Sequence, residues 1–303
     1  MKKATTAIRL TREDHVVNGV AIFIGLFVLL TTVYPIYYCL IYAFSDGNAA
    51  LAYQIYLLPT HPTLANFKAV FEDSLLVNSF VISVLRTTLA VITGVSFTAL
   101  TAYALTRREL KGRRIYSMVA MFTMYFSGGV IPTYLLYRSM GLVNSFWVYI
   151  IPSLLSVYNM LLIMAFFREI PESLIESAKL DGAGEFTILV RVVMPLSTPI
   201  LATIGLFVGV GAWNDWYTAA YFVNDQDLMP MSTILMRLVS AADAAQKARE
   251  AASASGVGVH NAGPTSVSIQ YATLLISIFP VMCVYPFVQK YFVKGVMVGA
   301  IKA

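Results

Sequence analysis

Apolar residues gather in six windows along the chain, separated by shorter polar segments. Crossing a bilayer as a helix takes about 20 mainly apolar residues, and each window reaches that length. Lipid offers no partner to an unpaired peptide group, so each window is expected to be helical. The pattern predicts an all-α polytopic membrane protein, with one transmembrane domain over residues 1–303 and six spans at approximately Val17–Phe44, Phe80–Leu105, Ile115–Tyr137, Phe146–Phe166, Thr198–Phe222 and Ile269–Tyr291.

Composition and charge placement support this topology. Hydrophobic residues make up 58% of the chain and charged residues only 12%, whereas a soluble domain carries roughly twice that charge. Most of the 21 basic residues fall in segments on the side of the two termini, which the positive-inside rule places in the cytoplasm. We therefore expect a multi-pass protein of the cell membrane with a cytoplasmic tail over 1–16, a cytoplasmic loop at about 168–195, and a long outer loop at about 223–268.

Several other classes of protein are disfavoured. The first window is too long for a cleavable signal and no small-residue cleavage site follows it, so it reads as a retained anchor. Cys39 and Cys283 lie inside predicted spans, and no metal-ligand cluster is evident. His15, His61 and His260 all fall outside the spans, which argues against an intramembrane enzyme. The basic excess suits lipid headgroups rather than nucleic acid, and no G-x-x-x-x-G-K-[ST] phosphate loop is present.

The cytoplasmic loop at 168–195 carries the signals of a short helix. Pro171 suits a first helical turn, and Glu172 and Glu176 favour the positive N-terminal half. Gly182 readily takes the left-handed conformation that ends a helix. An ordinary amphipathic helix at the membrane surface is the simpler interpretation of this segment.

The spacing in this loop is more specific than the helix signals. Glu176, Ala178, Gly182 and Pro195 fit E-A-A-x3-G-x9-I-x-L-P, with conservative departures at Ser177, Val192 and Met194. The loop resembles the EAA loop in the membrane subunits of binding-protein-dependent ABC importers. That resemblance implies a type I importer permease fold and a coupling helix that docks in a cleft of a separate ATPase, where the glutamate at 176 meets a basic residue. The implied ATPase-coupling residues are Glu172, Glu176, Ser177, Ala178, Leu180, Asp181, Gly182 and Pro195.

Further short motifs resemble the maltose-type permeases of carbohydrate importers. They are Asn78-Ser79, residues 102–107, residues 170–173, Trp213-Asn214-Asp215 and residues 299–302. Trp216, Met229-Pro230-Met231 and the long outer loop are most similar to permeases for oligosaccharides or polysaccharide fragments. The resemblance implies an oligosaccharide substrate, a second permease (homologous or an identical copy), an extracytoplasmic binding protein, and two ATPase subunits that use ATP and Mg. It implies no cofactor bound by this chain.

Few polar side chains fall within the spans, and each is a candidate for the substrate pathway because such groups are costly there. They are Asn78, Arg86, Asn159, Asn214 and Asp215. Simpler readings are that Arg86 snorkels outward and that Asn159 only packs helices together. The alternative function is a secondary transporter or channel without an ATPase, which usually carries paired ionisable residues or broken helices in mid-membrane. The nearly neutral interior expected here favours the importer permease.

Overall fold

The computed structural model describes residues 12–47, 57–254 and 265–300. The chain forms two compact units. The first comprises Met1–Ala69 and Arg249–Leu275, and the second comprises Val70–Ala248 and Ile276–Ala303. Most of the predicted N-terminal tail, His260 and the end of the 299–302 motif lie outside the described residues, so the expectations for them stay predictions.

The first unit contains the long helix α1, Arg12–Ala43. Its apolar side chains are exposed over most of its length, as a lipid-facing helix requires. The chain after α1 is held by Asn66, at the start of helix α3 (Ala65–Glu72), whose Nδ2 donates to the carbonyls of Ala43 and Ser45, both at 2.8 Å. Tyr38, Tyr42 and Tyr271 pack against one another in the same unit. Helix α1 already includes residues 12–16, which the charge pattern assigned to the tail.

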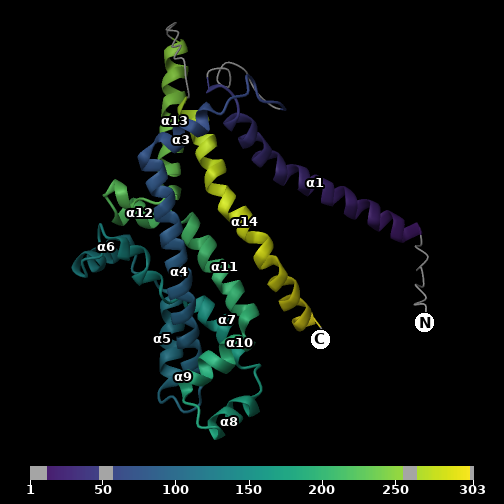
Figure 1. Ribbon diagram of the computed structural model, residues 1–303, viewed down its shortest axis with the longest axis vertical. Helices are drawn as coiled ribbons and strands as arrows, with labels where there is room; N and C mark the ends of the chain where they lie inside the picture. The colour runs from purple at the N-terminus through teal and green to yellow at the C-terminus, as the bar shows by residue number, and fades with distance from the viewer. Residues whose placement is uncertain (1–11, 48–56, 255–264, 301–303) are drawn as a thin grey trace. The chain divides into compact units, whose positions relative to one another are not determined.

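The second unit is built on helix α4, Ser74–Thr106, which packs against α7, Val157–Phe167, and α11, Thr198–Asn214 (Figure 1). Asp73 caps α4, because its carboxylate accepts the backbone N–H groups of Leu75 and Leu76, which otherwise lack helical partners. Glycine allows α11 to approach α4 closely: a Cβ at Gly209 would lie 3.3 Å from Val91 Cγ2. Small residues at such contacts are typical of membrane helix pairs.

Two of the predicted spans are interrupted. The window at 115–137 forms two helices, α5 (Arg113–Tyr125) and α6 (Val130–Ser139), because Gly129 adopts φ +83°, which no continuing helix allows. The window at 146–166 begins with two 3-10 turns, Phe146–Tyr149 and Ile151–Ser153, and continues as α7 after a 43° bend. Ser156 caps the new helix by accepting the backbone N–H of Asn159.

The fifth window begins at a sharp bend and is interrupted before its end. It is preceded by α9 (Glu185–Ile188), a π-helical turn (Leu189–Val193) and α10 (Met194–Leu196), and the chain turns by 85° into α11. Helix α11 ends at Asn214, and α12 resumes over Tyr217–Phe222. Three described helices are long and apolar enough to cross a membrane, or up to five if each bent pair is one span. The one predicted span not among these five is the window at 115–137, which is divided into α5 and α6.

The outer-loop region contains a longer helix than expected. A 3-10 turn, Gln226–Leu228, is followed by α13, Met231–Ala254. The segment at 241–254, whose alanine-rich composition favours a short helix, is the second half of α13. The last helix, α14, runs from Ser266 to Ala300. Within the second unit, a hydrogen bond joins α11 to α14: Trp213 Nε1 donates to the carbonyl of Ser277 at 3.0 Å.

Candidate functional site: a surface helix and a cavity in the helix bundle

The predicted surface helix is present as α8, Glu172–Leu180. Pro171 precedes it, Glu172 lies in its first turn and Lys179 in its last. It ends in a Schellman motif: Gly182 N–H donates to Lys179 O, and Ala183 N–H donates to Ala178 O, both at 3.0 Å. Gly182 adopts φ +81°, the left-handed conformation that this motif needs and that glycine takes without strain. The left-handed conformation expected of Gly182 at the end of the helix is confirmed.

Burial of one side chain fixes α8 to the bundle. Ile175 is 3% exposed and belongs to the same apolar cluster as Tyr103 on α4, Phe167 on α7 and Ile188 on α9. Ala178 packs against that cluster from the same face of α8, as the three-residue spacing dictates. Helices α8 and α9 lie at one end of α4 (Figure 1), so a force on α8 acts on the ends of several helices.

A charged network surrounds this contact. Lys179 Nζ lies 3.1 Å from Glu109 Oε1 and 2.8 Å from Glu185 Oε1, and Tyr103 OH donates to Glu185 Oε2 at 2.6 Å. The hydrogen bonds to Glu185 and Glu109 raise the pKa of Lys179 above its ordinary value. A hydrogen bond to its own backbone, and then the one from Lys179, lower the pKa of Glu109. The network joins α8 to the loop after α4 and to α9.

Sequence reasoning missed this network. Glu109 is 70 residues from Lys179, and no spacing rule connects them. An acidic residue near a lysine is also too common a pattern to signal a contact. A further ion pair, Arg108 to Glu172 at 3.7 Å, is highly exposed on both sides, and such pairs contribute little because water screens them.

The other face of α8 is exposed. Glu176 and Ser177 are both exposed, and Glu176 forms no ion pair with any residue that the structure describes. Leu180 is 89% exposed and Phe186, just beyond the helix, is 71% exposed. Asp181 and Pro195 are also exposed. Large apolar groups exposed beside polar ones often mark interaction sites, which makes this face of α8 a candidate docking surface.

A second candidate region is a cavity of about 630 Å³ in the second unit, within the ordinary range of small-molecule pockets, about 300–1,000 Å³. Residues of α4, α6, α7, α11 and α12 line it. Three of the five polar candidates from the sequence, Arg86, Asn159 and Asp215, are among the lining residues. Hydroxyl and aromatic side chains complete much of the wall: Ser127, Thr133, Tyr137, Tyr149, Ser153, Ser156, Tyr217, Thr218 and Phe222.

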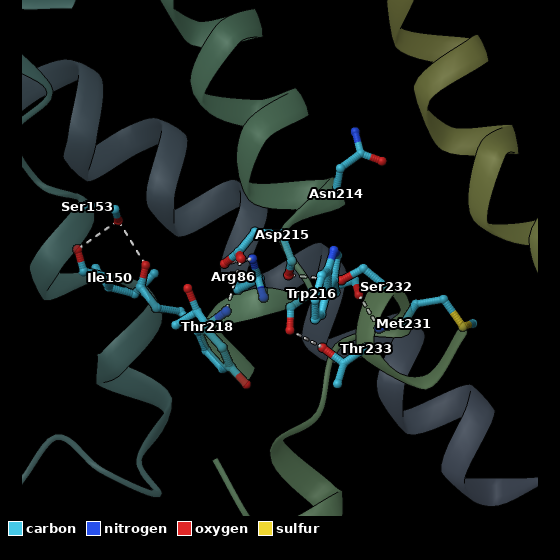
Figure 2. Close-up of polar contacts among 12 residues, drawn as sticks. Arg86, Ile150, Ser153, Asn214, Asp215, Trp216, Thr218, Met231, Ser232 and Thr233 are labelled. Atoms are coloured by element: carbon cyan, nitrogen blue, oxygen red, sulfur yellow. Dashed lines mark hydrogen bonds and ion pairs between the residues drawn. The ribbon is translucent and has the colours of Figure 1, made fainter. Parts of the chain in front are cut away.

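Arg86 and Asp215 form an ion pair (Figure 2). Arg86 Nη2 lies 2.9 Å from Asp215 Oδ2, and the two side chains are 3% and 30% exposed. The guanidinium also stacks over the ring of Tyr149, with its Cζ 4.6 Å from the ring centroid. Arg86 therefore does not snorkel outward, and that interpretation is wrong. The 129 residues between the partners hide the pair from sequence reasoning.

Asp215 also organises the break between α11 and α12. Its Oδ1 accepts the backbone N–H of Thr218 at 3.0 Å, which satisfies a donor at the start of α12. Its carbonyl accepts the hydroxyl of Ser232 at 3.0 Å, and the carbonyl of Trp216 accepts that of Thr233 at 3.2 Å. The backbone groups freed by the break are thereby paired with α13 (Figure 2).

The remaining two candidates do not line the cavity. Asn78 Nδ2 donates to the carbonyl of Asp227 at 2.7 Å, a contact between the start of α4 and the outer-loop region. Asn214 Nδ2 donates to the carbonyl of Val210, in its own helix, at 2.9 Å, and its side chain points away from the ion pair (Figure 2). The structure thus brings three candidates together and sets two apart.

Comparison with known proteins decides between the possible families. Residues 94–298 match the family described as the binding-protein-dependent transport system inner membrane component. The chain belongs to this family. It is 34% identical to the polygalacturonan/rhamnogalacturonan transport system permease protein YtcP of Bacillus subtilis over 280 residues, covering 92% of this chain and 96% of YtcP. It is also 34% identical to protein LplC of the same organism, covering 89% of this chain and 90% of LplC.

The fold agrees with solved importers. A chain in the crystal structure of a bacterial ABC transporter involved in the import of the acidic polysaccharide alginate superposes with a TM-score of 0.82 at 29% identity, covering 93% of this chain and 98% of that one. The predicted type I permease fold is confirmed. As a family member the chain is a multi-pass membrane protein and a transport subunit, and the ATPase of such a system is a separate subunit.

The comparisons also settle the alternative of a secondary transporter. That alternative is favoured by paired ionisable residues and broken helices inside the bundle, and the Arg86–Asp215 pair at the α11–α12 break has both features. The expected neutral interior was therefore an incomplete argument against it. Family membership supports the importer permease instead.

Proposed function

We propose that this permease forms half of the translocation pore of an ATP-driven importer for oligosaccharides. The observation that carries the proposal is α8, a rigid helix with the EAA spacing that is anchored by Ile175 on one face and exposed on the other. An importer whose membrane subunit lacks an ATPase needs such a lever. The substrate class is supported by the names of the relatives, since polygalacturonan and rhamnogalacturonan both appear in the name of YtcP.

The proposal assigns the coupling role to the exposed face of α8. Glu176 enters a cleft of the ATPase and pairs there with a basic residue, and Ser177, Leu180 and Asp181 lie against the cleft wall. Glu172 and Ala178 set the position of the helix, Gly182 sets its end, and Pro195 opens the span that receives the motion. The ATPase binds ATP and Mg, and this chain binds neither.

The same proposal gives the assembly and its orientation. The loop after α4 and the α8 segment lie at one end of the second unit, joined by Lys179 and Glu109, and most basic residues of the described loops lie there too. This end faces the cytoplasm, together with both termini. A second permease, homologous to this one, completes the pore, two ATPase subunits dock below, and an extracytoplasmic binding protein delivers substrate above. The cavity with Arg86, Asn159 and Asp215 lies on the substrate pathway.

Charge reversal at Glu176 tests the coupling assignment. Removing one partner of a desolvated charge pair costs about 2–5 kcal/mol, so Glu176→Lys should lose the ATPase in detergent pull-downs while the permease still inserts in the membrane. Lys111→Glu, a charge reversal in the nearby loop, is the control and should retain the ATPase. Full ATPase recovery with Glu176→Lys would refute the assignment.

A further inference from the structure

The cavity contains two charged side chains among the described residues that line it, Arg86 and Asp215. They are not equally accessible. Arg86 lines the cavity with a side chain that is only 3% exposed, and its terminal nitrogen Nη1 is fully buried, without a hydrogen-bond partner among the described residues. Asp215 remains 30% exposed. A molecule in the cavity therefore meets the carboxylate of Asp215 rather than the guanidinium of Arg86.

The carboxylate still has capacity for hydrogen bonds. An ionised carboxylate only accepts, at about four lone-pair positions. The hydrogen bonds found for Asp215 side-chain oxygens are those from Arg86 Nη2 and the backbone N–H of Thr218. Arg86 stays protonated at any physiological pH, so it offsets the charge of Asp215 and fixes its orientation. The cavity thus presents a charged carboxylate acceptor, whose charge is offset by the buried guanidinium of Arg86.

These properties select the chemistry of the ligand. A hydroxyl group donates to a carboxylate and forms a strong, charge-assisted hydrogen bond. A ligand carboxylate has no proton to donate at neutral pH, so it forms no hydrogen bond with Asp215 and brings a like charge against it, which disfavours binding. The aromatic rings of Tyr137, Tyr217 and Phe222 in the same wall suit the apolar face of a pyranose ring.

We propose that Asp215 is a substrate-binding residue that accepts hydroxyl protons of one saccharide unit, and that the cavity takes a neutral unit in preference to a uronate. Arg86 is a positioning residue that holds and compensates Asp215 without touching the substrate. The inference rests on the proposed function, because it names the chemistry of the unit that occupies the pathway. An acidic polysaccharide fragment would have to place a hydroxyl-bearing edge, and not its carboxylate, against Asp215.

Two saccharides of equal length test this assignment. The complete complex, with its partner permease, ATPase and binding protein, is reconstituted in proteoliposomes, and uptake of galactotriose and of trigalacturonate is measured for the wild type and for Asp215→Asn. The selectivity of the binding protein is the same in both complexes and cancels in the comparison. Asn214→Ala, the neighbouring residue that points away from the cavity, is the matched control.

Asp215→Asn should lower galactotriose uptake by about fivefold, the difference between a charged and a neutral acceptor, and should raise trigalacturonate uptake. Asn214→Ala should change neither. If Asp215 were only structural, the substitution would lower the uptake of both saccharides, and that result would overturn the proposal. Unchanged uptake of both saccharides, or a fall in trigalacturonate uptake alone, would overturn it as well. Asp215→Ser, which keeps a side-chain acceptor for Thr218 N–H, replaces Asn if that variant fails to assemble. A wild-type complex that takes up no oligosaccharide of a wider panel, these two included, contradicts the proposed function itself.

Discussion

The anchoring of α8 gives a prediction in which burial and charge compete. Two features hold the helix in place: Ile175, which is 3% exposed in the apolar cluster, and Lys179, which pairs with Glu109 and Glu185 at 3.1 and 2.8 Å. The charged groups are largely open to water, where screening leaves ion pairs little net stabilisation. Burial should therefore dominate, and Ile175→Ala should loosen α8 more than Lys179→Met.

The magnitude follows from the buried side chain. Truncating a buried isoleucine to alanine costs about 2–5 kcal/mol, and 1.4 kcal/mol already changes an equilibrium about tenfold. The population of detached α8 should therefore rise at least about tenfold in Ile175→Ala. A detached helix transmits no motion, so ATP hydrolysis should continue with little saccharide uptake.

Two measurements check this reasoning. Hydrogen–deuterium exchange over residues 172–182 reports the detachment of α8, and uptake per ATP hydrolysed reports the coupling in proteoliposomes. Leu174→Ala is a matched control, because Leu174 lies on the same helix but is 44% exposed, and it should behave as the wild type. The reasoning is refuted if Lys179→Met accelerates exchange or uncouples transport more strongly than Ile175→Ala does.

Three further predictions concern the end of α8, the charged network around it and the membrane topology. Gly182→Val should uncouple hydrolysis from uptake while keeping the ATPase bound, because valine is strained at φ +81° and opens the Schellman motif. Gly184→Val, at an ordinary φ of −72°, should have a weaker effect, and equal effects of the two variants would argue against the helix-end explanation. Because the pKa of Glu109 is lowered, the stabilisation from this carboxylate is present above its ordinary pKa and is lost only as pH falls through the lowered value. Hydrogen–deuterium exchange of α8, corrected for intrinsic rates, should therefore be unchanged from pH 8 to 6. A rise in the corrected exchange rate within that interval would contradict the assignment. A cysteine at Lys111 should react with a membrane-impermeant reagent only from the cytoplasm and one at Ser240, exposed on α13, only from outside, and labelling of both from one side would exclude the topology.

Local signals in the sequence were enough to predict much of the coupling helix. Pro171, Glu172 and Gly182 act within one or two turns of the chain, so their spacing carries over directly into α8 and its Schellman end. Ile175 was not singled out, because an isoleucine in a short helix does not reveal whether it meets a core. Its burial depends on Tyr103, Phe167 and Ile188, which arrive from three other helices.

The bundle interior was less predictable for the same reason. Hydropathy locates apolar windows but does not sense the turn at Gly129 or the break after Asn214, because both interruptions use few residues and leave the average apolar character unchanged. Arg86 and Asp215 were each identified as costly in a membrane, yet only the packing of α4 against α11 brings them to 2.9 Å. The two residues, which the sequence offers as separate candidates, therefore form a single ion pair in the cavity lining.

The energy source of transport tests the central claim most directly. The permease pair is reconstituted in proteoliposomes with the binding protein and a panel of labelled oligosaccharides, with and without the ATPase subunits, and uptake is measured with internal or external ATP and with imposed proton or sodium gradients. The account predicts uptake of at least one oligosaccharide only when the ATPase is present and ATP is on its side of the membrane. Uptake driven by an ion gradient without the ATPase would contradict it.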